Sequence, residues 1–147
     1  GLGVRKCENE AVNWYRLSAE QGNASAQYEL GVCYSFGQGV DRNYEQAVKW
    51  YRLSANQNHA HAQFSLGICY SFGQGVEKSY EEALKWFRLS AQQGNTNAQY
   101  HLGVFYYYGK GIERSDGEAV RWFRLSSERG NAEAQKALDQ LLELQQK

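Results

Sequence analysis

Glycines at fixed spacing are the first feature of this sequence that could do chemistry. The stretch Tyr-Ser-Phe-Gly-Gln-Gly-Val occurs twice, at 34–40 and 70–76. Glycine-rich loops can bind phosphate through backbone N–H groups, but a dinucleotide loop needs a third glycine after a strand, and a Walker loop ends in Gly-Lys-Ser/Thr. Here the second glycine is followed by valine, and the surrounding chain favours helix. The pattern therefore predicts a turn that ends a helix.

Histidines are the next candidates, because a His-Ala-His sequence could supply two metal ligands. The three histidines are His59, His61 and His101. No cysteine or carboxylate lies around His59 and His61 at the spacing of a closed four-ligand zinc site. His59 lies 36 residues after Asn23 and 36 before Asn95, which predicts a helix N-cap. We therefore predict no metal site and no cofactor.

Cysteine and serine are possible nucleophiles. The cysteines are Cys7, Cys33 and Cys69, an odd number without paired spacing, so the sequence predicts buried free thiols in a reducing compartment. Cys33 and Cys69 fall on an apolar stripe without an activating base. Four recurring serines are expected to be small packing residues: Ser18, Ser54, Ser90 and Ser126. We predict no catalytic residue and no enzyme activity.

Charge and hydropathy exclude other classes of function. Lysine plus arginine equals aspartate plus glutamate at 16 each, which gives no electrostatic reason to expect nucleic acid. No apolar run approaches the roughly 20 residues of a membrane helix, so we expect no membrane insertion.

Residues 1–4 match the loop at 37–40, so we expect a piece of a longer protein that begins inside a loop and lacks its own first helix. The compartment is left open, with the cytoplasm favoured by the free cysteines.

A 36-residue period organises the chain. Tryptophan recurs at this spacing, as Trp14, Trp50, Trp86 and Trp122. The period predicts one repeat domain over 1–147, with full repeats at 24–59, 60–95 and 96–131, a partial repeat at 1–23 and a closing helix at 132–147.

Each repeat has the pattern of two helices. Apolar residues at helical spacing predict a first helix from Ala24 to Phe36 and a second from Tyr44 to Gln57. Gly31, inside the first helix, is expected to make room for an aromatic ring of the neighbouring helix. Capping sequences are expected to begin the second helices at Asn43, Ser79 and Ser115. Left-handed residues are expected to end them at Gly22, Asn58, Gly94 and Gly130.

These repeats resemble a known family. The pattern Ala-x-Ala-Gln, Leu-Gly-x-x-Tyr, Gly-x-Gly-Val, an aromatic pair and a final alanine is similar to the SEL-one-like repeat (SLR), a relative of the tetratricopeptide repeat. In the first full repeat it is carried by Ala24, Ala26, Gln27, Leu30, Gly31, Tyr34, Gly37, Gly39, Val40, Ala47, Trp50, Tyr51 and Ala55. The resemblance covers essentially the whole chain. It implies an all-α, right-handed superhelix, or solenoid, of stacked helix pairs that scaffolds protein complexes.

A second stripe on the first helices is not explained by packing within one helix pair. Tyr28, Val32 and Phe36 lie at i, i+4 and i+8, roughly opposite Leu30. Two interpretations stay open: the stripe packs against the helix of the next repeat, or it lines a concave binding surface. The candidate partner-binding residues are Tyr28, Phe36, Phe64, Phe72, Tyr100, Tyr107, Tyr108, His61 and His101.

We therefore predict a non-catalytic scaffold or adaptor that binds a protein, as a peptide or helical segment, along the concave face of the first helices. Two alternatives are kept. One is an enzyme like the β-lactamase-like or penicillin-binding activity described for cysteine-rich relatives, although those cysteine positions hold residues such as Ser54 and Ala60 here. The other is a structural spacer in a longer chain.

Overall fold

All regular structure in the described part of the chain is helical. The computed structural model describes the backbone of residues 2–147 and the side chains of residues 9–144, 146 and 147. The described backbone forms eight helices: α1 (Leu2–Glu20), α2 (Ala24–Phe36), α3 (Tyr44–Asn56), α4 (Ala60–Phe72), α5 (Tyr80–Gln92), α6 (Thr96–Tyr108), α7 (Asp116–Ser127) and α8 (Ala132–Gln145). The all-α prediction is confirmed, and the ends predicted for the two helices of the first full repeat agree within one residue.

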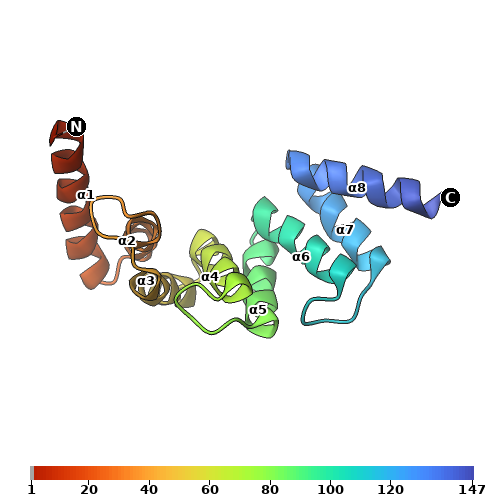
Figure 1. Ribbon diagram of the computed structural model, residues 1–147, viewed down its shortest axis with the longest axis horizontal. Coiled ribbons are helices and arrows are strands. Elements are labelled where there is room, and N and C mark those ends of the chain that lie inside the picture. Colours follow the sequence, from red (N-terminus) through yellow and green to blue (C-terminus); the bar gives the residue numbers. More distant parts are fainter. Residues whose placement is uncertain (1) are drawn as a thin grey trace. The chain divides into compact units, whose positions relative to one another are not determined.

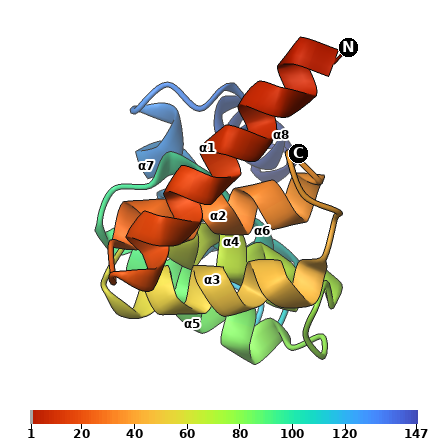
Figure 2. The same ribbon diagram turned by 90° about the vertical axis from the view of Figure 1, so that its left-hand side faces the viewer.

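The helices divide into two compact units, the first ending at Lys78 and the second running from Ser79 to Lys147. In the first unit α1 packs on α2, α2 on α3, and α3 on α4. In the second, α5 packs on α6, α6 on α7, and α7 on α8. Figure 1 shows this succession by label, and Figure 2 shows α1, α2 and α3 one beside the next. Each of these contacts joins helices adjacent in sequence, as expected of stacked helix-pair repeats.

The expectation that the chain begins in a loop is wrong for residues 2–4. Gly1 lies outside the described residues, and α1 starts at Leu2 and continues to Glu20. A single glycine inside a helix costs only about 1 kcal/mol, which a long helical run tolerates. In the matching stretch at 37–40, by contrast, Gly37 and Gly39 have positive φ, which ends α2.

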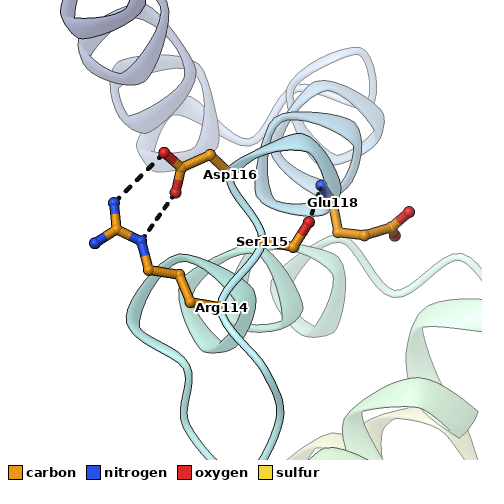
Figure 3. Close-up of polar contacts among 4 residues, drawn as sticks. All are labelled: Arg114, Ser115, Asp116 and Glu118. Atoms are coloured by element: carbon orange, nitrogen blue, oxygen red, sulfur yellow. Dashed lines mark hydrogen bonds and ion pairs between the residues drawn. The ribbon is translucent and has the colours of Figure 1, made fainter.

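Side-chain caps begin the helices as predicted. The second helices are capped by Asn43, Ser79 and Ser115, whose oxygens accept the backbone N–H three residues on at 3.0–3.2 Å. Figure 3 shows this bond between Ser115 and the N–H of Glu118. The first helices are capped at one repeat position by Asn23, His59, Asn95 and Asn131. The residues expected to end the preceding helices, including Asn58, all have positive φ.

Glycine inside the first helix permits close packing, as predicted. A Cβ at Gly31 would lie 2.6 Å from ring carbons of Tyr51, and one at Gly103 would lie 2.5 Å from those of Phe123. Real Cβ atoms do not approach carbon this closely, so the absent side chain sets the spacing between the two helices of a repeat.

Both glycines of the loop have a structural role. Gly37 adopts the left-handed conformation, and its N–H donates to the Cys33 carbonyl. A Cβ at Gly75 would collide with the Tyr44 backbone. The loop of one repeat therefore lies against the start of the preceding repeat's second helix. The predicted turn is confirmed.

Buried polar groups also tie neighbouring helices together. Ser54 is buried as predicted, and its hydroxyl also donates to the Ala24 carbonyl at 2.7 Å, a bond the sequence analysis did not foresee. Ser126 does the same to Thr96. Cys33 and Cys69 are buried free thiols, as predicted, while Cys7 lies outside the described side chains.

Candidate functional site

A hollow opens between two first helices in the first unit. The α2–α4 hollow has a volume of about 290 Å³, and side chains of α3 form its floor. It is lined by Ser35, Phe36, Tyr44, Tyr51, Phe64, Ser65, Ile68, Cys69 and Gln74. Aromatic and aliphatic side chains form most of this lining, as in sites that bind an apolar side chain.

A second hollow opens in the second unit. The α6–α8 hollow has a volume of about 210 Å³. Its lining consists of Tyr100, Val104, Tyr107, Tyr108, Phe123, Ala137, Gln140, Leu141 and Leu144. Here α7 provides the floor, through Phe123.

The two hollows occupy the same place in the repeat. Six lining positions correspond, each pair separated by two repeat periods: Ser35 and Tyr107, Phe36 and Tyr108, Tyr51 and Phe123, Ser65 and Ala137, Ile68 and Gln140, Cys69 and Leu141. Because the backbone of the repeat recurs, a hollow between consecutive first helices recurs with it. The side chains differ, so each copy offers a different surface.

Five of the nine predicted partner-binding residues line these hollows. Phe36 and Phe64 meet in the α2–α4 hollow, and Tyr100, Tyr107 and Tyr108 in the α6–α8 hollow. Phe36 and Tyr108 are 71% and 66% exposed, which is unusual for rings of this size.

The other four predicted residues lie outside both hollows. Phe72 ends α4 and is 67% exposed. Tyr28 is half-buried, and its ring stacks on the His59 imidazole at 5.0 Å, with His61 at 6.0 Å. His101 stacks on buried Phe87 at 5.2 Å.

Neutral polar groups lie at the floor of the α2–α4 hollow. The Ser35 and Tyr51 hydroxyls form a hydrogen bond of 2.9 Å. Burial raises the pKa of the Tyr51 phenol well above its usual value, although its hydrogen bond to Ser35 opposes this. Burial also raises the pKa of the Cys69 thiol to about 11. Both groups are therefore protonated at neutral pH and are not activated nucleophiles.

The floor of the α6–α8 hollow is less polar. Phe123 replaces Tyr51, Leu141 replaces Cys69, and Ala137 replaces Ser65. Tyr107, Tyr108 and Gln140 add polar groups elsewhere in the lining of this hollow, so the two hollows differ in where their polar groups lie.

Cations lie on the rim of the α6–α8 hollow. The Arg114 guanidinium lies 5.3 Å from the Tyr107 ring centre, and the Lys110 ammonium 5.4 Å from that of Tyr108. Arg114 also donates to both carboxylate oxygens of Asp116, at 3.1 and 3.4 Å (Figure 3). These cation–π contacts place Lys110 and Arg114, in the loop after α6, against the aromatic rings at the end of that helix.

The histidines have different structural roles. His59 caps α4, as predicted: its Nδ1 accepts the Ala62 N–H at 3.3 Å. Burial and the nearby His61 lower the pKa of His59, while Glu29 opposes the shift. Burial, with a smaller effect of Lys110, lowers the pKa of His101 to about 4.

The repeat pattern does not predict the floors and the outer wall of these hollows. From the sequence, Tyr51 belongs to the repeat pattern and α8 is a closing helix alone. The spacing of Ala137, Leu141 and Leu144 at i, i+4 and i+7 was a signal that α8 presents an apolar stripe.

Metal-binding clusters and membrane-spanning helices are both absent from the described residues. Within them, no group of three or more histidine, cysteine, aspartate or glutamate residues lies close enough to hold a metal ion. Their helices are each too short or too polar to cross a membrane.

Comparison with protein families identifies the repeat. The family model of the Sel1 repeat matches residues 1–23, 24–59, 60–95 and 96–131. The chain belongs to the Sel1 repeat family. The resemblance to SEL-one-like repeats is thereby confirmed. Sel1 repeat proteins are typically protein-interaction scaffolds and are generally not catalytic.

Solved structures with the same fold support this assignment. A Sel1 repeat protein from Oxalobacter formigenes is 42% identical, with a TM-score of 0.83 over 88% of this chain. The protein c5321, a protective antigen of uropathogenic Escherichia coli with an SLR fold, is 39% identical, with a TM-score of 0.88 over 93% of this chain. The predicted fold class, an all-α solenoid of helix-pair repeats, is confirmed.

A more distant structure shares the fold alone. The cysteine-rich protein B of Helicobacter pylori is 21% identical, with a TM-score of 0.71 over 92% of this chain and 97% of its own length. The Sel1 repeats here span 54% of the Oxalobacter protein and 29% of c5321. None of the curated proteins compared with the chain matches it.

Proposed function

We propose that this Sel1 repeat chain is a scaffold that binds a peptide or helical segment of a protein partner along its first helices. The observation that carries the proposal is the recurrence of one hollow at the same repeat positions in both units, each beside an exposed aromatic ring, Phe36 or Tyr108.

The chemistry of the hollows suits side chains of a protein. Aromatic residues supply a large share of binding energy at protein interfaces, and small neighbouring pockets give them specificity. The α2–α4 hollow contains neutral hydroxyls at its floor, and the α6–α8 hollow is apolar there. An apolar side chain with a polar end would suit the α2–α4 hollow, and an apolar anchor would suit the floor of the α6–α8 hollow.

Site-specific photo-crosslinking tests the proposal. A benzophenone amino acid is placed at Phe36, at Tyr108, or at Leu53 as a control on the second helix α3, where the native side chain is 42% exposed. After illumination in lysate of the source organism, mass spectrometry identifies the bridged peptides. We expect partner peptides to be bridged to position 36 and to position 108, and not to position 53.

Other results would count against the proposal. Equal crosslinking at all three positions would indicate non-specific adhesion. Crosslinks confined to position 53 would move the binding surface to the second helices. The absence of crosslinks would favour the structural spacer.

A further inference from the structure

The helices that form the outer walls of the two hollows are capped by different residues. The outer wall of the α2–α4 hollow is α4, which carries Phe64 one turn after its cap. The cap acceptor is the imidazole Nδ1 of His59, which accepts the Ala62 N–H at 3.3 Å. The corresponding wall of the other hollow, α8, is capped by the amide oxygen of Asn131. An amide oxygen does not titrate near neutral pH, whereas an imidazole nitrogen does.

We propose that His59 is a pH-sensitive cap: protonation of its Nδ1 breaks the bond to the Ala62 N–H, loosens the first turn of α4 and weakens binding at the α2–α4 hollow. The step from α4 to binding rests on the proposed function. The loosening of α4 itself does not.

Protonation acts on this cap in two ways. A protonated Nδ1 is a donor, so it would face the N–H of Ala62 with no lone pair to accept it. The imidazolium would also lie at the positive end of the α4 dipole, where a cation is unfavourable. Asparagine at the same position in the other repeats has neither property.

The surroundings of His59 favour the neutral ring. On α2, the Tyr28 ring stacks on it at 5.0 Å, and Glu29 is the nearby carboxylate. On α4, the His61 ring lies at 6.0 Å. On α3, Tyr51 contacts Tyr28, and its phenol stays neutral in this range. Burial and His61 outweigh Glu29, so the pKa of His59 is below its ordinary value.

The direction of the pH effect follows from that lowered pKa. The opened turn, with an ordinary histidine pKa of about 6.5, binds a proton more readily than the capped turn. The contribution of the cap is therefore fully present above about pH 6.5 and is lost as the pH falls through the lower pKa of the capped state.

Amide hydrogen exchange of the free protein tests the cap without any partner. We expect the protection factor of the Ala62 amide to fall roughly tenfold between pH 7.5 and 5.0, in line with the loss of an N-cap. His59→Asn, which copies the other repeats, should retain its protection at both pH values. His61→Asn, which copies Asn97 of the third repeat, should still lose protection at low pH, but at a higher pH than the wild type, because the His61 charge that lowers the pKa of His59 is removed. Equal pH dependence in the wild type and His59→Asn would overturn the proposal.

Crosslinking at two pH values tests the step to binding. At pH 5.0 the yield at position 36 should fall relative to pH 7.5 in the wild type but not in His59→Asn, with position 108 less affected in both. A loss of Ala62 protection with an unchanged yield at position 36 would contradict the coupling alone. No crosslink at either pH would contradict the proposed function, while hydrogen exchange would still decide the cap.

Discussion

The size of single residues determines how closely the two helices of a repeat pack in this chain. Gly31 and Gly103 have no side chain, and the aromatic rings of Tyr51 and Phe123 fill the space that results. The same rings form the floors of the two hollows. The glycine that permits close packing of a repeat therefore also fixes the depth of its hollow.

The substitution Gly31→Ala should destabilise the protein. Alanine is better than glycine in a helix by about 1 kcal/mol, but its Cβ would overlap the Tyr51 ring, and overpacking typically costs about 1–3 kcal/mol. We expect a net loss of up to about 2 kcal/mol in the free energy of unfolding, measured by urea denaturation.

Gly117→Ala is the matched control. Gly117 lies in α7, and the nearest atom to its added Cβ would be the Ser115 hydroxyl oxygen at 4.0 Å. This variant should be neutral, or stabilised by up to about 1 kcal/mol. A Gly31→Ala protein as stable as Gly117→Ala would show that Tyr51 moves aside without cost.

At the scale of elements, most of the structure was predictable because its signals are local and repeated. Helix caps, left-handed ends and the glycine inside the first helix each depend on a few neighbouring residues, and each was confirmed at several positions. The loop expected at residues 2–4 is helical instead, since the similarity of Gly3 to Gly39 does not by itself determine the backbone conformation.

The second glycine of each loop joins one repeat to the previous one. Gly75 has a φ of 69°, and an added Cβ would collide with the Tyr44 backbone. A left-handed non-glycine residue costs about 1–2 kcal/mol, and a backbone collision adds to this. We expect Gly75→Ala to lose about 3 kcal/mol or more in the free energy of unfolding.

Gly130→Ala separates the two causes. Gly130 also has positive φ, at 91°, but nothing lies within 4 Å of its added Cβ. It should lose only the conformational part, about 1–2 kcal/mol. If urea denaturation gave equal losses for the two variants, the contact between the loop and α3 would have no energetic importance.

At the scale of the whole molecule, the repeat explains both what was foreseen and what was missed. The period predicted the family and the solenoid of helix pairs, because identical framework residues recur at fixed spacing. It also predicted exposed rings at Phe36 and Tyr108. It could not predict which rings share a hollow, since that depends on how far consecutive first helices separate. Phe72 and His101 line neither of the two hollows, and their part in partner binding stays a prediction.

The central claim is that the hollows beside the first helices bind a protein partner. Its most direct test is the affinity of the Phe36→Ala/Tyr108→Ala protein for the partner segment identified by crosslinking, measured by calorimetry. Exposed aromatic anchors at an interface typically contribute more than 1 kcal/mol each, so we expect a loss of about thirtyfold or more.

The control is Leu53→Ala/Leu89→Ala, which removes exposed apolar side chains from the second helices α3 and α5. Circular dichroism should show both proteins folded. The account predicts weakened binding for the aromatic pair and unchanged binding for the leucine pair. Unchanged affinity of a folded Phe36→Ala/Tyr108→Ala protein would contradict it.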